Sequence, residues 1–111
     1  MSGIERIARE RQRQIDKEQW SAEHDDEHRH GEIAMAAAVY AMTPTERANE
    51  ILRQNLAELL WPWDWGWFKP GKKGRTIKSS LRNRIRELEK AGALCAAEID
   101  RLERLEAAQD A

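Results

Sequence analysis

Apolar residues recur along this chain with a period near that of the α-helix, so its regular elements are expected to be helices. Ser2 and Glu5 form a capping box that opens the first helix, whose apolar stripe runs from Ile4 to Ile15. A second helix is expected at residues 31–41, where alanines line the inner faces. So small a surface lets neighbouring helices, or a ligand, approach closely.

A third helix is predicted over residues 44–60, because Thr43 and Glu46 form a second capping box ahead of a clean apolar face. Two prolines and three glycines interrupt the pattern at residues 61–75, which predicts a loop. The last helix is expected to begin near residue 76 and to run to about residue 107.

The last helix carries a heptad seam, in which apolar or small residues alternate at spacings of four and three. Such a seam is typical of the core of a helical bundle, and it can also join subunits. The seam positions are Leu81, Ile85, Leu88, Gly92, Cys95, Ile99 and Leu102.

Composition supports the same fold class. The 111 residues fit one small domain, and 35% of them are charged while 41% are hydrophobic, with few β-branched residues. We therefore expect a single all-α domain over residues 1–111, a bundle of about four helices with a Trp-rich loop before a long C-terminal helix. The single cysteine, Cys95, excludes a disulfide framework and fits a reducing cytoplasm.

Charge narrows the possible partners. The net charge of −1 argues against a DNA or RNA duplex as partner, and no apolar run is long enough to cross a membrane. Residues 16–32 hold seven acids and two bases, whereas residues 69–90 hold nine bases and two acids. These segments are either two solvated faces that attract each other or an acidic cleft beside a basic lip that holds phosphate.

Tryptophan is concentrated in one place. Four of the five tryptophans lie in "WPWDWGW", next to Phe68 and a run of basic residues. Aromatic faces stack on nucleobases and cations hold phosphates, so this loop is a candidate ligand site. For Trp61 and Trp63 a plug at one end of the bundle is the better interpretation, while for Trp65 and Trp67 such a plug and a contact with a ligand or subunit fit equally well.

Carboxylates and imidazoles crowd the stretch "SAEHDDEHRHGEIA" at residues 21–34. His24 and His28 are one helical turn apart, as are His28 and Glu32. Carboxylate oxygens suit Mg²⁺ or Mn²⁺, and imidazoles suit Zn²⁺. Any charged helix offers such pairs, so the spacing by itself leaves a solvated helix entrance equally open.

Three blocks of the sequence resemble a set of short phage and prophage proteins: "ERQRQIDKEQWSAEHDDEHRHGEIAMAAAVYA", "WPWDWGWFKP" and "RELEKAGALCAAEIDRLER". The resemblance covers residues 5–42, 61–70 and 86–104. More distantly, the arrangement is similar to the MazG-like, all-α nucleoside triphosphate pyrophosphohydrolases. Those enzymes bind Mg²⁺ through an E-E-x-x-E motif on one helix and an E-x-x-D motif on a later one.

The resemblance implies a pocket whose metal ligands are mostly absent. "GEIAM" places Gly31, Glu32 and Met35 where the enzymes have three glutamates. "ELEK" places Glu87 and Lys90 where they have glutamate and aspartate. A lysine at that position puts a positive charge where a cation should bind.

The resemblance therefore implies a phage-type protein in the cytoplasm of the infected host. It would sequester a nucleotide signal of antiphage defence, either a cyclic oligonucleotide or an ADP-ribose derivative, without hydrolysing it and without a cofactor. It is expected to form homo-oligomers. The expected ligand-binding residues are Arg13, Trp20, His24, Asp25, Glu32, Tyr40, Trp65, Trp67 and Lys69.

Two alternatives remain open. One is a Mg²⁺-dependent MazG-like pyrophosphohydrolase with rearranged ligands. The other is an inhibitor that binds a host enzyme through its Trp loop. The metal ligands of the enzyme alternative would be Glu23, Asp25, Asp26, His28, Glu32 and Glu87.

Overall fold

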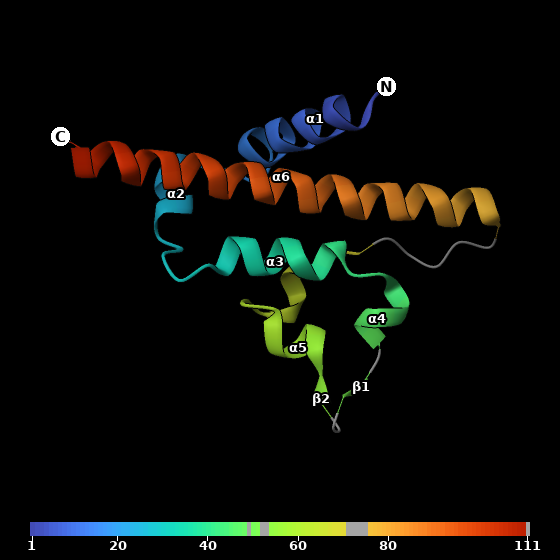
Figure 1. Ribbon diagram of the computed structural model, residues 1–111. Helices are drawn as coiled ribbons and strands as arrows, with labels where there is room; N and C mark the ends of the chain where they lie inside the picture. The colour runs from blue at the N-terminus through green and yellow to red at the C-terminus, as the bar shows by residue number, and fades with distance from the viewer. Residues whose placement is uncertain (49, 52–53, 71–75, 111) are drawn as a thin grey trace.

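The long helix α6 (Ile77–Asp110) is the axis of the fold, and two shorter helices pack on different sides of it. The computed structural model describes residues 1–48, 50–51, 54–70 and 76–110. Figure 1 shows α1 (Gly3–Asp16) along one side of α6 and α3 (Glu32–Ala41) along another. The remaining elements lie against α3, against α6 or against one another.

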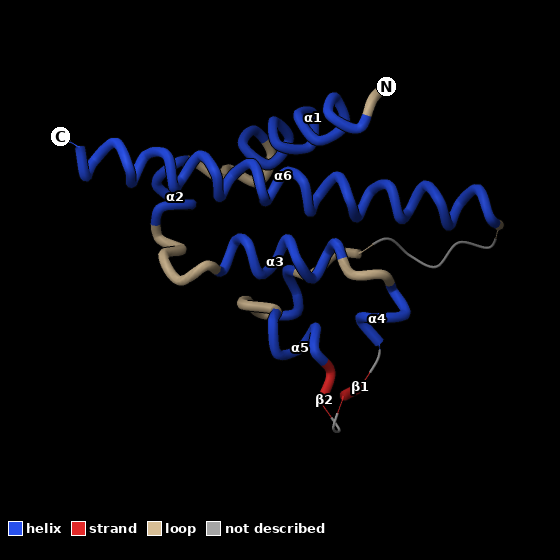
Figure 2. Tube along the Cα trace, in the orientation of Figure 1, coloured by secondary structure: helices blue, strands red, loops and turns tan. Residues whose placement is uncertain are grey.

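These remaining elements are short, and helix dominates the described chain, as Figure 2 shows. The all-α class and the long C-terminal helix are therefore confirmed. No helix among the described residues is both long and apolar enough to cross a membrane. The short elements are α2 (Ala22–Asp26), α4 (Pro44–Ala48), β1 (Glu50–Ile51), β2 (Gln54–Asn55), α5 (Leu56–Leu60) and the 3-10 helix η1 (Trp65–Trp67).

The apolar core lies between α3 and α6 and continues under α5 and the Trp loop. Small side chains dominate it, in keeping with the alanines expected on the inner faces of residues 31–41. Ala36 and Val39 of α3 are fully buried, as is Ala93 of α6. The other core residues are Ile33, Ala37, Tyr40, Ala57, Trp61, Ala91, Leu94 and Ala97.

Helix α1 begins with the predicted capping box, since Ser2 Oγ accepts from the Glu5 amide and Glu5 accepts from the Ser2 amide. Its apolar stripe, however, does not form the buried face. Ile4 is 82% exposed, while Glu10 and Gln14 are 3% and 2% exposed. The reason is an ion pair with α6, in which Arg86 lies 2.7 Å from Glu10. This ion pair directs the polar face of α1 toward α6.

The predicted continuous helix over residues 44–60 is also wrong. The chain forms two five-residue helices separated by a hairpin in which Glu50 pairs with Asn55 and Ile51 with Gln54. Asn55 gives the local reason, because its side chain accepts from the Glu58 amide and so begins a new helix. Residues 49, 52–53, 71–75 and 111 lie outside the described residues, including the "GKKG" and Arg75 of the basic turn.

The heptad seam of α6 does not form the core of this chain. Leu81, Ile85 and Leu88 are 59%, 40% and 44% exposed, and Ile99 and Leu102 are 56% and 48% exposed. α6 instead buries a neighbouring face that includes Ala91, Leu94 and Ala97. The interpretation of the seam as intramolecular core is therefore wrong for these positions.

Candidate functional site

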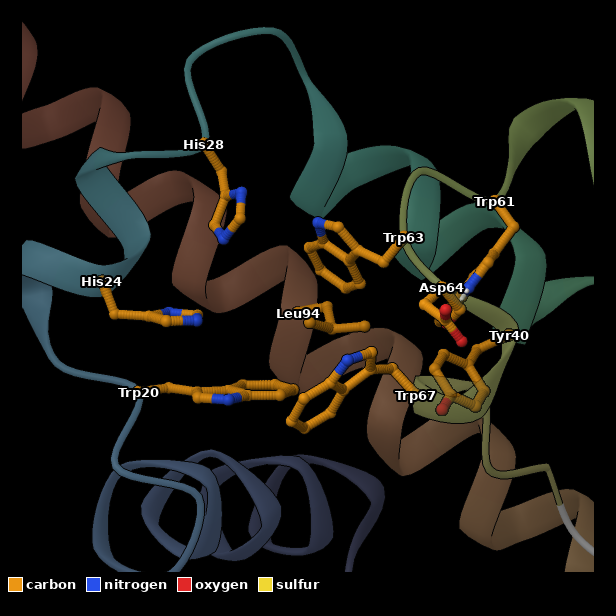
Figure 3. Close-up of a pocket in the computed structure, with 9 residues that line it drawn as sticks. All are labelled: Trp20, His24, His28, Tyr40, Trp61, Trp63, Asp64, Trp67 and Leu94. Atoms are coloured by element: carbon orange, nitrogen blue, oxygen red, sulfur yellow. Dashed lines mark hydrogen bonds between the residues drawn. The ribbon is translucent and has the colours of Figure 1, made fainter.

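A cavity of about 300 Å³ opens where the turn after α1, the helix α3, the Trp loop and α6 meet. Aromatic rings form most of its wall, and Figure 3 shows them facing a common space. The cavity is lined by Trp20, His24, His28, Tyr40, Trp61, Trp63, Asp64, Trp67 and Leu94. Helix α2 and the turn after it also contribute, through His24 and His28, so the site exists only in the folded protein.

The turn after α1 brings Trp20 to the cavity. Gln19 adopts a left-handed backbone conformation with φ of 59°, and the Trp20 amide donates to the Gln14 carbonyl at 3.1 Å. Ser21 then caps α2 by accepting from the His24 amide at 3.2 Å. As a result the rings of Trp20 and His24 stack in parallel planes, 5.6 Å between centroids.

His28 continues this wall toward the Trp loop. Its ring packs edge-on against His24 and Trp63, with centroids 5.1 and 5.3 Å away. Its Nδ1 lies 2.8 Å from a carboxylate oxygen of Glu32. Burial alone would raise the pKa of Glu32, but the bonds from His28 and the His30 amide outweigh it and hold the pKa below its ordinary value.

The Trp-rich segment at residues 61–68, the Trp loop, forms the wall of the cavity opposite Trp20 and His24. Trp61 is 7% exposed, and its indole N–H donates to the Asp64 carbonyl at 3.2 Å. Asp64 in turn accepts from the Gly66 amide at 2.8 Å, which starts the 3-10 turn that carries Trp67. Trp63 Nε1 is buried and has no hydrogen-bond partner among the described residues. An indole donor is therefore left unpaired in a residue that lines the cavity.

Tyr40 and two lysines join the cavity to its polar end. The Tyr40 hydroxyl accepts from the Lys69 amide at 2.9 Å, and burial raises the pKa of Tyr40. The Lys90 ammonium donates to the Lys69 carbonyl and lies 5.6 Å from the centre of the Tyr40 ring. Burial, followed by the repulsion of Arg86, lowers the pKa of Lys90.

A smaller cavity of about 40 Å³ adjoins the first and shares Trp20, Tyr40, Trp67 and Leu94 with it. Its other walls are charged or polar, in contrast to the aromatic cavity. The residues found only here are Glu10, Arg13, Gln14, Glu18, Lys69 and Lys90. The two cavities together form one site, which we call the cleft, with an aromatic end and a polar end.

The polar end is held by a salt-bridge network. Arg13 donates two bonds to Glu10, at 2.7 and 3.0 Å, and one to Glu18 at 3.0 Å. Burial would raise the pKa of Glu10, but the bonds from Arg13 and Arg86 outweigh it and lower that pKa. Gln14 is 2% exposed, and its amide oxygen has no partner among the described residues. A buried acceptor is thus unpaired beside this network.

Six of the nine expected ligand-binding residues line the cleft: Arg13, Trp20, His24, Tyr40, Trp67 and Lys69. The other three do not line it. Asp25 is 1% exposed and is held by Arg11 at 3.2 Å. Glu32 pairs with His28, and Trp65 stacks on Trp61 and is 44% exposed.

Sequence reasoning missed part of the polar end. Glu10, Gln14 and Lys90 had no expected ligand role, and their signal is weak because each lies on a helix rich in polar residues. Trp61 and Trp63 were interpreted as a plug, and they both close the core and line the cavity. The basic lip is present in Lys69 and Lys90, which line the polar end together with Glu10 of α1 and with Glu18 of the predicted acidic segment.

The alternative metal ligands are not brought together. Among the residues that the structure describes, no three His, Cys, Asp or Glu side chains are grouped as metal ligands would be. Asp25 pairs with Arg11 and Asp26 with Arg104, the latter at 2.8 Å. Glu87 lies between Arg47 of α4 and Arg84 of α6. Each of these carboxylates already has a cationic partner.

Comparisons of this chain with protein-family models, with curated proteins and with solved structures find no match. The fold and the site therefore define its class by themselves. It is an all-α protein in which a Trp-rich loop closes an aromatic cleft against a long C-terminal helix.

Proposed function

We propose that the cleft binds a nucleotide-derived small molecule and holds it without hydrolysis. The observation that carries this proposal is a pair of unpaired polar atoms, one at each end of the cleft. Trp63 Nε1 is a donor at the aromatic end, and Gln14 Oε1 is an acceptor at the polar end. Buried polar groups are nearly always paired, so a ligand that satisfies both atoms is the economical explanation.

The aromatic end suits a nucleobase. Its volume of about 300 Å³ lies at the lower limit of small-molecule sites, which span about 300–1,000 Å³. Stacking on an aromatic side chain contributes about 1–3 kcal/mol per base. Ring nitrogens and carbonyl oxygens of a base are the acceptors that the Trp63 indole lacks.

The polar end suits a ribose and its phosphates. Gln14 Oε1 and the carboxylate of Glu18 accept hydrogen bonds from ribose hydroxyls without a metal ion. Lys69 and Lys90 supply cations for phosphate, and charge-assisted bonds of this kind are the strong ones. The charge of Glu10 is already offset by Arg13 and Arg86, so it repels a phosphate less than a free carboxylate would.

Sequestration is the role that fits a binding site of this kind in a phage-type protein. In this proposal the protein removes a nucleotide signal of antiphage defence, such as a cyclic oligonucleotide or an ADP-ribose derivative, inside the infected cell. A pyrophosphohydrolase needs a cluster of carboxylates around Mg²⁺, and the described residues form none. Sequestration requires only affinity.

The test is calorimetric titration with ADP-ribose, a cyclic dinucleotide, AMP, and ATP with and without Mg²⁺. Trp67→Ala should weaken binding of the best probe by about tenfold or more, which corresponds to ~1.4 kcal/mol. Trp65→Ala is the matched control, because Trp65 belongs to the same 3-10 turn but lies outside the cleft. EDTA should leave binding unchanged, and the probe should be recovered intact after the protein is denatured.

Two results would overturn the proposal. Loss of the probe during incubation with Mg²⁺ would favour the pyrophosphohydrolase alternative. Absence of binding to every probe would favour the inhibitor of a host enzyme, for which the 44% exposed Trp65 is the specific observation. In that case Trp65→Ala should abolish capture of the host protein.

A further inference from the structure

An uncovered apolar stripe runs along most of α6, on a different side from the cleft. Leu94 lines the cleft, whereas the seam from Leu81 to Leu102 faces away from α3. Five large side chains of this seam are between 40% and 59% exposed, and Cys95 is exposed as well. Isolated exposed leucines are ordinary, but a regular heptad of them marks an interaction surface.

Helix α1 borders the stripe and makes it a groove. Ile7 packs so closely on Gly92 that an added Cβ would lie 2.5 Å from its terminal methyl carbon. Toward the start of α6 the two helices diverge, and a hollow of about 310 Å³ opens between them. Its lining includes Ile7, Ile85 and Leu88, and Ile4 nearby is 82% exposed. The groove thus has apolar walls from two helices.

We propose that a second copy of this chain covers the stripe, with its α6 antiparallel to the first. The distribution of charge along α6 favours an antiparallel second copy as the partner. The exposed charges of α6 that form no ion pair among the described residues are basic near its start, at Lys78 and Arg82, and acidic near its end, at Glu103, Glu106 and Asp110. An antiparallel pair places each basic half against an acidic half, and a parallel pair places like charges together.

The heptad fixes which residues meet. Setting Gly92 against Cys95 of the second copy pairs Leu88 with Ile99 of the second copy, and Ile85 with Leu102 of the second copy. Arg82 then flanks the seam beside Glu103 of the second copy. Arg82 and Glu103 are both exposed and form no ion pair among the described residues, so both charges remain available for a partner.

The first test measures mass by light scattering and sedimentation over a concentration series. The wild-type chain should be a dimer in the micromolar range. Leu88→Glu should raise the dissociation constant by about 100-fold or more, because each dimer would bury two carboxylates against apolar side chains. The control is Leu59→Glu, which alters a leucine of α5 that is 59% exposed and lies off the stripe. Both variants should keep the wild-type circular dichroism.

The second test fixes the orientation. Arg82→Glu and Glu103→Arg should each weaken the dimer, and the double variant should restore it. The two positions are 21 residues apart, about 31 Å along one helix, so only antiparallel pairing lets them meet. In a C95S background, a mixture of L88C and I99C chains should form a disulfide-linked heterodimer on oxidation, and neither variant alone should cross-link.

Each remaining outcome overturns the inference. If the wild-type chain is a monomer at every concentration of the series, the interface is refuted. Cross-linking of L88C with itself would refute the antiparallel orientation. A dimer that Leu59→Glu disrupts as much as Leu88→Glu would place the contact elsewhere. Ligand binding in the cleft is measured separately, so failure here leaves the proposed function untouched.

Discussion

Glu87 offers the sharpest test of whether the acidic residues of this chain serve structure or metal binding. Its carboxylate is 2% exposed and lies between Arg47 at 2.8 Å and Arg84 at 3.0 Å. The two guanidinium groups also donate to the Met42 carbonyl, at 2.8 and 2.9 Å, and so hold the end of α3 against α6. Glu87→Gln removes the only charge in this group that offsets the two cations.

The magnitude follows from the burial of each partner. Breaking a fully buried ion pair costs about 3–5 kcal/mol, but Arg47 and Arg84 keep their carbonyl partners and are 10% and 25% exposed. We therefore expect Glu87→Gln to lower the free energy of unfolding by about 2–3 kcal/mol. Glu89→Gln is the control, because Glu89 makes two 3.5 Å contacts and should contribute under about 1 kcal/mol.

Urea unfolding at one protein concentration, followed by tryptophan fluorescence and circular dichroism, measures both changes. Equal losses for the two variants would refute the structural role. Mg²⁺ provides a second readout, since a ligand that binds only the folded state raises its stability. If Mg²⁺ stabilised the wild type and not Glu87→Gln, Glu87 would be a metal ligand, as the resemblance to pyrophosphohydrolases implies for its position.

Two further predictions concern the polar end of the cleft. Tyr40→Phe removes the acceptor of the Lys69 amide, so it should cost about 1 kcal/mol of stability and weaken probe binding, measured by urea unfolding and calorimetry. Burial lowers the pKa of Lys90 below 10.5. Phosphate affinity should therefore fall as the pH rises through that lowered pKa. Over the same pH range the free energy of unfolding should rise, because the lysine keeps its proton to higher pH in the unfolded chain than in the folded one. Lys90→Met should bind phosphate-bearing probes more weakly and lose this pH dependence, and an unchanged profile would show that Lys90 does not contact the ligand.

Helix starts were readable from sequence wherever a side chain caps the first turn. Ser2 bonds to Glu5 as expected, and Thr43 accepts from the Glu46 amide at 3.2 Å. Side-chain capping also explains why the prediction of one helix over residues 44–60 is wrong. Asn55 is also a good N-cap, and a cap inside an apolar periodic segment divides it, which periodicity alone does not reveal.

Which face of a helix is buried was less predictable. A heptad of apolar residues has the same spacing whether it packs against the same chain or lies exposed. The seam of α6 therefore predicts a helix but does not identify what packs against it. α1 was harder still, because its buried face consists of Glu10 and Gln14. Their burial depends on Arg86, which lies 76 residues from Glu10 in the sequence.

The crowded stretch at residues 23–32 shows how one segment divides its chemistry between stability and the site. Two of its acids hold helices together: Asp25 bonds to Arg11 of α1 and Asp26 to Arg104 of α6, so α2 is fixed to both helices. Its imidazoles, one turn apart, extend the aromatic wall from Trp20. His24 and His28 are four residues apart, a spacing that two metal ligands on a helix could have. The same spacing places their two rings on one face of α2 and the turn after it. Because no acid of residues 23–32 lines the cleft, this segment contributes aromatic surface to the cleft and no negative charge, so an anionic ligand can bind beside it.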